Sequence, residues 1–182
     1  MKKNFIEDMF EGLDHENMRL VEYLSIHCRG YTASAAKQLS EYHLNVLSEI
    51  DDIFLHNDTP IALLNTADGM LSFLVRKWIQ VIYALRYEIT AVHTTYSQFV
   101  AAVKAYDDTL VNRVVRAPFL ILEYPELVSN ADWARGKLLD AVQLKRNMLI
   151  VTSDFEKTKQ VFGEVVSHTV NSMGVSVVDM KG

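Results

Sequence analysis

The chain has 182 residues, of which 49% are hydrophobic, and its formal net charge is -5 at pH 7. This length and composition predict one domain with a sizeable core, and the acidic balance argues against a free-standing nucleic-acid binder, because phosphate neutralisation needs surplus Lys and Arg. No apolar run reaches the ~20 residues of a membrane span, so we expect no membrane contact. The lone Cys28 excludes an internal disulfide and a cysteine-clustered zinc site, which favours a cytoplasmic protein. From the acidic balance we expect at most weak DNA binding.

Residues 1–56 are predicted to form an N-terminal helical segment. A short helix near residues 3–13 carries an apolar stripe made of Phe5, Ile6, Met9, Phe10 and Leu13. This stripe could cover the core, or it could dock into a groove on a partner protein.

Further helices are predicted near residues 15–27 and 34–55. The second of these places one group of apolar side chains on a single face: Leu39, Val46, Leu47, Ile50 and Phe54. His43 shares that face, and the histidines His15, His27, His43 and His56 show no metal-ligand spacing, so no metal site is predicted.

At residue 57 the pattern changes to that of an α/β sheet. A strand is predicted at Ile61–Leu64, followed by a tight loop and a long helix with Leu71, Leu74, Val75, Trp78, Ile82 and Leu85 in register. Strand, loop and helix form the context of the phosphate-binding loop G-x-x-x-x-G-K-[ST]. On that frame Asn65 and Met70 stand at the two glycine positions, Leu71 stands at the lysine, and Ser72 keeps the hydroxyl, while Gly69 occupies a different position.

These replacements remove the chemistry that holds phosphate. The glycines of a phosphate-binding loop let backbone N–H groups surround phosphate oxygens, and the lysine neutralises their charge. Leu71 carries no charge, and Asp68 adds a negative charge whose repulsion of phosphate would be on the order of 1–4 kcal/mol. We therefore expect no bound cofactor, although an ordinary turn in an unrelated α/β protein would give the same pattern.

The second half of the chain predicts further strands and helices. A strand near 88–93 precedes a helix from Ser97 with Phe99, Val100, Val103 and Tyr106 on one side. The apolar runs Phe119–Leu122 and Met148–Val151 flank a helix with Ala134, Leu138, Ala141 and Val142 at helical spacing, which is one βαβ unit. A capping box from Ser153 to Glu156 then opens a helix bearing Phe155, Phe162, Val165, Val166 and Thr169, and a strand follows at 175–179.

Polar residues follow the two central strands, at the edge where ligands bind in such sheets. Glu123 follows the first strand, and Thr152, Ser153 and Asp154 follow the second. A strand ending in an acid, a Trp-containing helix with a terminal Arg, and a strand ending in a polar triplet together resemble the helicase-loader and transposition-helper branch of the AAA+ ATPases. In that branch an acidic pair handles Mg²⁺ and water, and the triplet senses the γ-phosphate. Here Glu123-Tyr124 and Thr152-Ser153-Asp154 stand at those positions in altered form.

The resemblance implies the fold. We expect a mostly parallel five-stranded sheet with helices on both faces, a degenerate P-loop NTPase or AAA+-like core, in the strand order 5-1-4-3-2. The strands should lie near 61–64, 88–93, 118–122, 148–152 and 175–179. This core would span residues 57–182 without a helical lid. The arginine that the branch carries in its last helix is missing at 167–170.

Three functional hypotheses follow. The first is a non-catalytic adaptor or regulator that binds a replicative helicase, an initiator or transposase machinery, with the stripe from Phe5 to Leu13 as its contact and with homo-oligomers possible. The second is a working ATPase with an atypical phosphate loop. The third is an unrelated α/β enzyme or binding module, for which Glu123 and Glu126 would be an acid/base pair. We favour the first, and we assign no catalytic residue.

Overall fold

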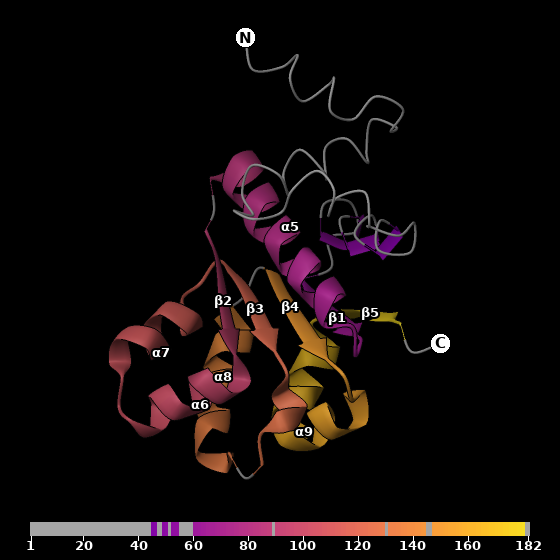
Figure 1. Cartoon of the computed structure of the whole chain (residues 1–182). Helices are drawn as coiled ribbons and strands as arrows, with labels where there is room; N and C mark the ends of the chain where they lie inside the picture. The colour runs from indigo at the N-terminus through magenta and orange to yellow at the C-terminus, as the bar shows by residue number, and fades with distance from the viewer. Residues whose placement is uncertain are drawn as a thin grey trace, which may run out of the picture.

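The computed structural model shows a parallel sheet between two helical layers (Figure 1). Helix α5 covers one face, and helices α6 to α9 cover the other. The residues that the structure describes are 45–46, 49–50, 52–54, 60–88, 90–129, 131–144 and 147–180. The predicted helices near 3–13 and 15–27, and with them the stripe from Phe5 to Leu13, lie outside these residues.

The five strands are β1 (Ile61–Asn65), β2 (Ala91–Thr95), β3 (Phe119–Glu123), β4 (Asn147–Thr152) and β5 (Val175–Asp179). Their order is β2-β3-β4-β1-β5, and all four neighbouring pairs are parallel. The predicted order 5-1-4-3-2 is therefore confirmed. Strands β1 and β3 are buried along their whole length, as expected for apolar runs covered on both faces.

The helices are α5 (Gly69–Tyr87), α6 (Tyr96–Lys104), α7 (Asp108–Val115), α8 (Asp132–Leu144) and α9 (Phe155–Ser172), with a 3₁₀ turn η1 at Pro125–Leu127. No helix among the described residues is both long enough and apolar enough to cross a bilayer. The part of the chain that the structure describes also contains no group of three or more His, Cys, Asp or Glu side chains placed to hold a metal ion.

The predicted stripe of α5 is confirmed where its side chains are described. Leu71, Leu74 and Val75 are fully buried, and Trp78 is 7% exposed. The end of the third predicted helix packs into the same cluster through Val46 and Ile50. The ring of Phe54 meets Phe119 of β3 edge-on at 4.9 Å, so this segment also covers the sheet.

In the opposite layer the prediction for α8 is confirmed, and those for α6 and α9 need correction. Ala134, Leu138, Ala141 and Val142 of α8 are all buried, as their spacing predicts. Tyr106 does not lie on the apolar side of α6: the helix ends at Lys104, and Tyr106 sits in a turn at φ 55° with 90% of its surface exposed.

In α9 the predicted inward position of Val165 is wrong, because its side chain is 66% exposed. Gly163 interrupts the helix at φ 73° and ψ 174°, so the residues after it leave the register of the residues before it.

Two boundaries also differ from prediction. Strand β2 begins at Ala91 rather than near 88, because α5 continues to Tyr87 and Glu88 turns the chain at φ 54°. Helix α9 is capped by Asp154, whose carboxylate accepts a hydrogen bond from the Lys157 N–H at 3.0 Å, and not by Ser153.

Candidate functional site

The predicted site lies at the carboxyl edge of the sheet, beginning with the turn from β1 to α5. Residues 66–68 make this connection. The Thr66 N–H donates to the Thr152 carbonyl of β4 at 2.7 Å, and the Asp68 N–H donates to Thr66 Oγ1 at 3.0 Å. The turn is therefore short, and it is held by one hydrogen bond to β4 and one within the turn itself.

Asp68 caps the N-terminus of α5. Its carboxylate accepts a hydrogen bond from the Leu71 N–H at 3.1 Å, while its carbonyl accepts from the Ser72 N–H at 3.1 Å and from Ser72 Oγ at 3.2 Å. Side-chain capping of this kind satisfies a donor that the first helical turn leaves without an intrahelical partner. An internal carboxylate thus occupies the end of the helix where an external anion would otherwise bind.

The other residues of the predicted loop serve the fold. The Leu71 side chain is fully buried in the core, and a Cβ placed on Gly69 would meet nothing within 4 Å, so no close approach requires glycine there. Asn65 donates from Nδ2 to Asp179 Oδ1 at 3.0 Å, which links β1 to β5. The side chain of Met70 lies outside the described set.

Glu123 ends β3 on the face that α5 covers, and sequence reasoning missed its two partners. Its Oε2 lies 3.2 Å from Arg76 Nη1 of α5 and 2.7 Å from His93 Nε2 of β2. The carboxylate is 3% exposed, and its Oε1 has no hydrogen-bond partner in the described structure. The guanidinium beside it disfavours a divalent cation, because two positive groups would compete for one carboxylate. The residues present therefore do not fit Mg²⁺ bound through Glu123.

Glu126 holds the polar triplet after β4. This carboxylate, 2% exposed in the turn η1, accepts hydrogen bonds from Thr152 Oγ1 at 2.9 Å and from both the N–H and the hydroxyl of Ser153, at 2.8 and 2.7 Å. Thr152 Oγ1 also lies 2.8 Å from Thr158 Oγ1 of α9 and accepts from the Asp154 N–H. A buried network with its members paired rigidifies the loops it joins.

The structure thus separates the predicted site residues into three internal clusters. Asp68 is bonded within the first turn of α5, Glu123 pairs with Arg76 and His93, and the triplet Thr152-Ser153-Asp154 is fixed by Glu126 and by the cap of α9. Glu123 and Glu126 belong to different networks, which gives no support to an acid/base pair.

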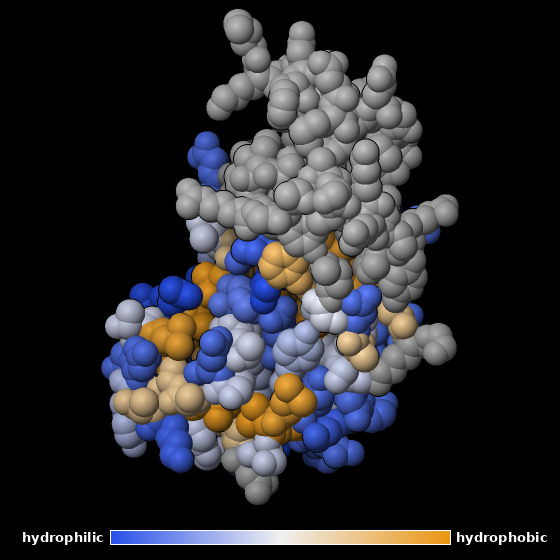
Figure 2. All heavy atoms as spheres, viewed as in Figure 1, coloured by the Kyte–Doolittle hydropathy of each residue, from blue (hydrophilic) through white to orange (hydrophobic). Residues whose placement is uncertain are grey.

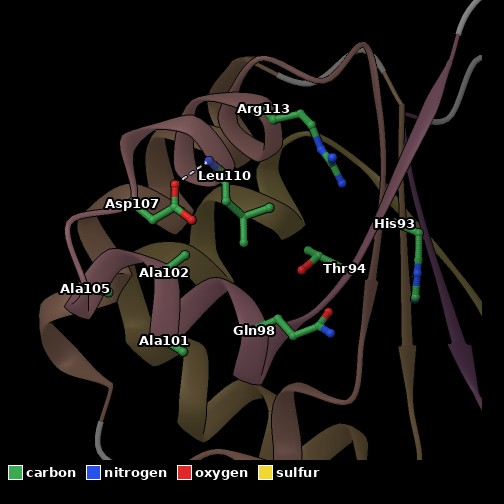
Figure 3. A pocket seen from close by; sticks show the side chains of 9 residues that line it. All are labelled: His93, Thr94, Gln98, Ala101, Ala102, Ala105, Asp107, Leu110 and Arg113. Atoms are coloured by element: carbon green, nitrogen blue, oxygen red, sulfur yellow. Dashed lines mark hydrogen bonds between the residues drawn. The ribbon is translucent and has the colours of Figure 1, made fainter.

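A cavity of about 500 Å³ lies elsewhere, beside β2, α6 and α7 (Figure 3). Its lining includes none of the predicted site residues, but it does include His93, the partner of Glu123. The side chains of His93 and Thr94 extend from opposite sides of β2. Sequence reasoning did not find this cavity, because its walls come from three elements and carry no motif.

Comparison with known proteins identifies the fold. No family model matches the sequence, and no curated protein matches it significantly. Among solved structures, the chain is similar to a DnaC helicase loader with a TM-score of 0.60 and 16% identity, over 88% of this chain and 99% of the loader. It is also similar to a candidate primosome component from Streptococcus pyogenes serotype M3, with a TM-score of 0.57 and 12% identity over 100% and 98% of the two chains.

AMPPCP-bound DnaA from Aquifex aeolicus matches with a TM-score of 0.58 and 12% identity, over 78% of this chain and 47% of DnaA. Such low identities establish a shared fold and leave function open. The chain shares the AAA+-like fold of these structures.

Proposed function

We propose that this chain is a non-catalytic adaptor or regulator that binds a protein of the DNA replication machinery. The observation that carries the first half of the proposal is the Asp68 carboxylate at the N-terminus of α5. In this fold a nucleotide phosphate would need the same helix end, and an anion already covalently present there repels a second one.

The other residues of the predicted nucleotide site support the same interpretation, a non-catalytic chain. Leu71 buries its side chain in the core instead of offering a charge, and Ser72 gives its hydroxyl to the Asp68 carbonyl. Arg76 and His93 engage the Glu123 carboxylate. Asp68, Ser72 and Glu123 thus have partners inside the protein in place of a nucleotide or its metal.

The resemblance to structures of a helicase loader and a candidate primosome component supports the second half of the proposal. A replicative helicase is the partner that we favour, with an initiator or transposase machinery as the alternatives. The stripe Phe5, Ile6, Met9, Phe10 and Leu13 remains our hypothesis for the contact surface, since buried aromatic side chains dominate such interfaces.

Nucleotide binding is tested by thermal melts of the full chain with millimolar Mg-ATP and Mg-ADP. We expect no shift, because stabilisation needs ligand in excess of its dissociation constant. Asp68→Ala serves as the companion variant: it should lower stability by about 0.5–2 kcal/mol through loss of the cap, and it should still show no shift with nucleotide. A rise of several degrees with Mg-ATP that Ser72→Ala abolishes would show a working nucleotide site.

Partner binding is tested by biolayer interferometry with the purified replicative helicase of the source organism, with and without Mg-ATP added. We expect binding by the wild-type chain and at least tenfold weaker binding by the Phe5→Ala/Phe10→Ala double variant, which corresponds to about 1.4 kcal/mol. A double variant that melts like wild type yet binds undiminished would remove the stripe from the interface. Failure of the wild-type chain to bind helicase would leave the initiator and the transposase machinery to be tried in the same format.

A further inference from the structure

Strand β2 forms one edge of the sheet and pairs with β3 alone among the described strands. An edge strand presents a row of backbone N–H and C=O groups, and proteins usually blunt such an edge with lysine, proline or a covering element. The β2 sequence, Ala91 to Thr95, contains neither lysine nor proline. Nothing in the strand itself therefore prevents another strand from pairing with it.

The cavity beside this edge is open and has room for a ligand. Its volume of about 500 Å³ lies within the roughly 300–1,000 Å³ typical of ligand pockets. Its lining comes from β2, α6 and α7 and includes Thr94, Ala101, Ala102, Ala105, Asp107 and Arg113. The three alanines belong to α6 and the turn after it, and their small side chains leave space for a peptide backbone to approach.

Arg113 gives the cavity its charge. Figure 3 shows its side chain extending from α7 toward β2. Within the described structure its guanidinium makes no ion pair or hydrogen bond. The one acidic residue of the lining, Asp107, uses its carboxylate to cap α7 by accepting from the Leu110 N–H at 3.1 Å. Among the described residues, the cavity therefore holds an arginine without an ionic partner beside a sheet edge that no further strand pairs with.

The cavity lining is not a broad apolar groove, because polar and charged side chains lie among its alanines and Leu110. On the coloured part of the face shown in Figure 2, hydrophobic residues lie in several patches with hydrophilic residues between them. A nucleic acid fits poorly as well. Binding to its phosphate backbone draws on several basic side chains, whereas this lining supplies a single arginine, near an aspartate.

We propose that this cavity binds an extended acidic peptide segment of a partner protein, which adds a strand to β2 and pairs one carboxylate with Arg113. Main-chain hydrogen bonds along a sheet edge supply affinity in this mode of recognition, and pockets for alternate side chains supply specificity. An arginine favours a carboxylate there, because the planar guanidinium can donate two parallel hydrogen bonds to it. No residue of the Phe5–Leu13 stripe is among the lining residues, so this proposal does not depend on the proposed helicase contact.

The test uses three fluorescein-labelled peptides and fluorescence anisotropy with the full chain. The first has the sequence Thr-Val-Thr-Glu-Val-Thr-Val, and the second replaces the central Glu by Lys. The third keeps Glu but carries N-methyl groups on alternate residues. It is made in two versions, or registers, one methylated at the odd-numbered residues and the other at the even-numbered residues. On the wild-type chain we expect the Glu peptide to bind at least tenfold more tightly than the Lys peptide, and one N-methyl register to abolish binding.

Charge reversal then identifies the cation. Arg113→Glu should lose at least tenfold in affinity for the Glu peptide and should prefer the Lys peptide. Arg116→Glu is the matched control, because Arg116 is an exposed arginine at the end of the same helix that does not line the cavity, and it should bind as wild type does. Both variants are checked by thermal melting. If Arg113→Glu fails to fold, Arg113→Gln replaces it and should bind the Glu and Lys peptides equally.

Several results overturn the proposal. For the wild-type chain, these are absence of Glu-peptide binding at millimolar concentration, equal affinity for the Glu and Lys peptides, and binding that neither N-methyl register reduces. For the variants, it is an equal effect of Arg113→Glu and Arg116→Glu. Binding of a twelve-residue oligothymidylate that disappears in Arg113→Glu, without peptide binding, would assign the cavity to single-stranded nucleic acid instead.

Discussion

Replacing the Glu126 carboxylate tests whether the carboxyl edge of the sheet is held together by internal hydrogen bonds. This side chain is buried and accepts from Thr152 Oγ1, from the Ser153 N–H and from the Ser153 hydroxyl. In Glu126→Ala all three donors lose their acceptor. In Glu126→Gln one carboxamide oxygen remains as an acceptor, and an NH₂ group takes the place of the other oxygen.

The magnitude follows from what each donor can do next. Thr152 can turn its hydroxyl to Thr158 Oγ1, which is 2.8 Å away, and the half-buried Ser153 hydroxyl can turn toward solvent. The Ser153 N–H cannot rotate, so it stays unsatisfied at about 1–3 kcal/mol, and lost packing adds to this. We expect Glu126→Ala to destabilise by about 2–4 kcal/mol. Glu126→Gln should cost about 1 kcal/mol, because Thr152 Oγ1 can accept from the new amide.

Urea denaturation followed by circular dichroism measures both free energies of unfolding. For a chain of this size the alanine variant should also melt roughly 5–15 °C lower. Glu156→Ala is the matched control: Glu156 is an exposed glutamate on α9 whose ion pair with Lys159 lies at the surface, so its loss should cost under about 1 kcal/mol. If Glu126→Ala unfolds within 1 kcal/mol of wild type, or if the two glutamate variants behave alike, the buried network does not stabilise this edge.

Two further substitutions test the layers. Trp78→Ala should destabilise by roughly 3–5 kcal/mol in the same denaturation assay, because it leaves a cavity against the sheet; a variant that melts like wild type would show that α5 packs differently. Gly163→Ala should cost about 1–3 kcal/mol, since φ 73° with ψ 174° is nearly restricted to glycine and a Cβ would lie 3.2 Å from Arg135 Cζ; an increase in stability would mean that α9 can run straight through this position.

The parts of the fold that were predictable from sequence are those that local pattern determines. The apolar runs of β1, β3 and β4 are continuous because both faces of these strands are covered, and the stripes of α5 and α8 repeat at the helical period because one side faces the sheet. The strand order came from the resemblance to the AAA+ fold, and the structure confirms it.

The pairings within the candidate site were not predictable, because they join residues far apart in the chain. Glu123 meets His93 and Arg76 across separations of 30 and 47 residues, and no local spacing signals either contact. The sequence offered one weak signal: His93 on the edge strand and Arg76 on a helix are polar, and the strand next to β2 ends in Glu123.

The break in α9 was hidden for the same reason. A single glycine in a helical pattern is usually tolerated, so Gly163 gave no reason to end the helix. The break depends on Arg135 of α8, whose Nε donates to the Val161 carbonyl at 2.8 Å and whose Nη2 donates to the Gln160 carbonyl at 3.2 Å. Carbonyl oxygens at the end of the first half of α9 thus find donors on another helix, which a reading of α9 alone cannot reveal.

Tyr96, at the start of α6, provides a test with a defined pH dependence. Its ring lies between Phe99 and Phe162, with centroids 6.2 and 6.0 Å away, and its hydroxyl has no hydrogen-bond partner in the described part of the chain. Burial raises the pKa of this phenol from 10.0 to about 12; nearby Arg135 opposes the shift and Asp132 adds to it. The folded state therefore holds the proton more tightly than the unfolded state, so this contribution to stability is complete below pH 10 and is lost as the pH rises toward 12.

Tyr96→Phe removes the titrating group and keeps the ring. At pH 7 the free energy of unfolding of the variant should equal that of wild type or exceed it by up to about 1–2 kcal/mol, because a buried hydroxyl without a partner costs desolvation energy. Between pH 9 and pH 11 the free energy of unfolding of wild type should fall by about 1.3 kcal/mol more than that of the variant. The reason is that the Tyr96 phenol ionises with a pKa of 10.0 in the unfolded state and of about 12 in the folded state. Urea denaturation of both proteins at each pH measures this difference, and the remaining tyrosines cancel because both proteins share them. A difference that stays constant across this range would mean that the Tyr96 hydroxyl reaches solvent in the folded protein.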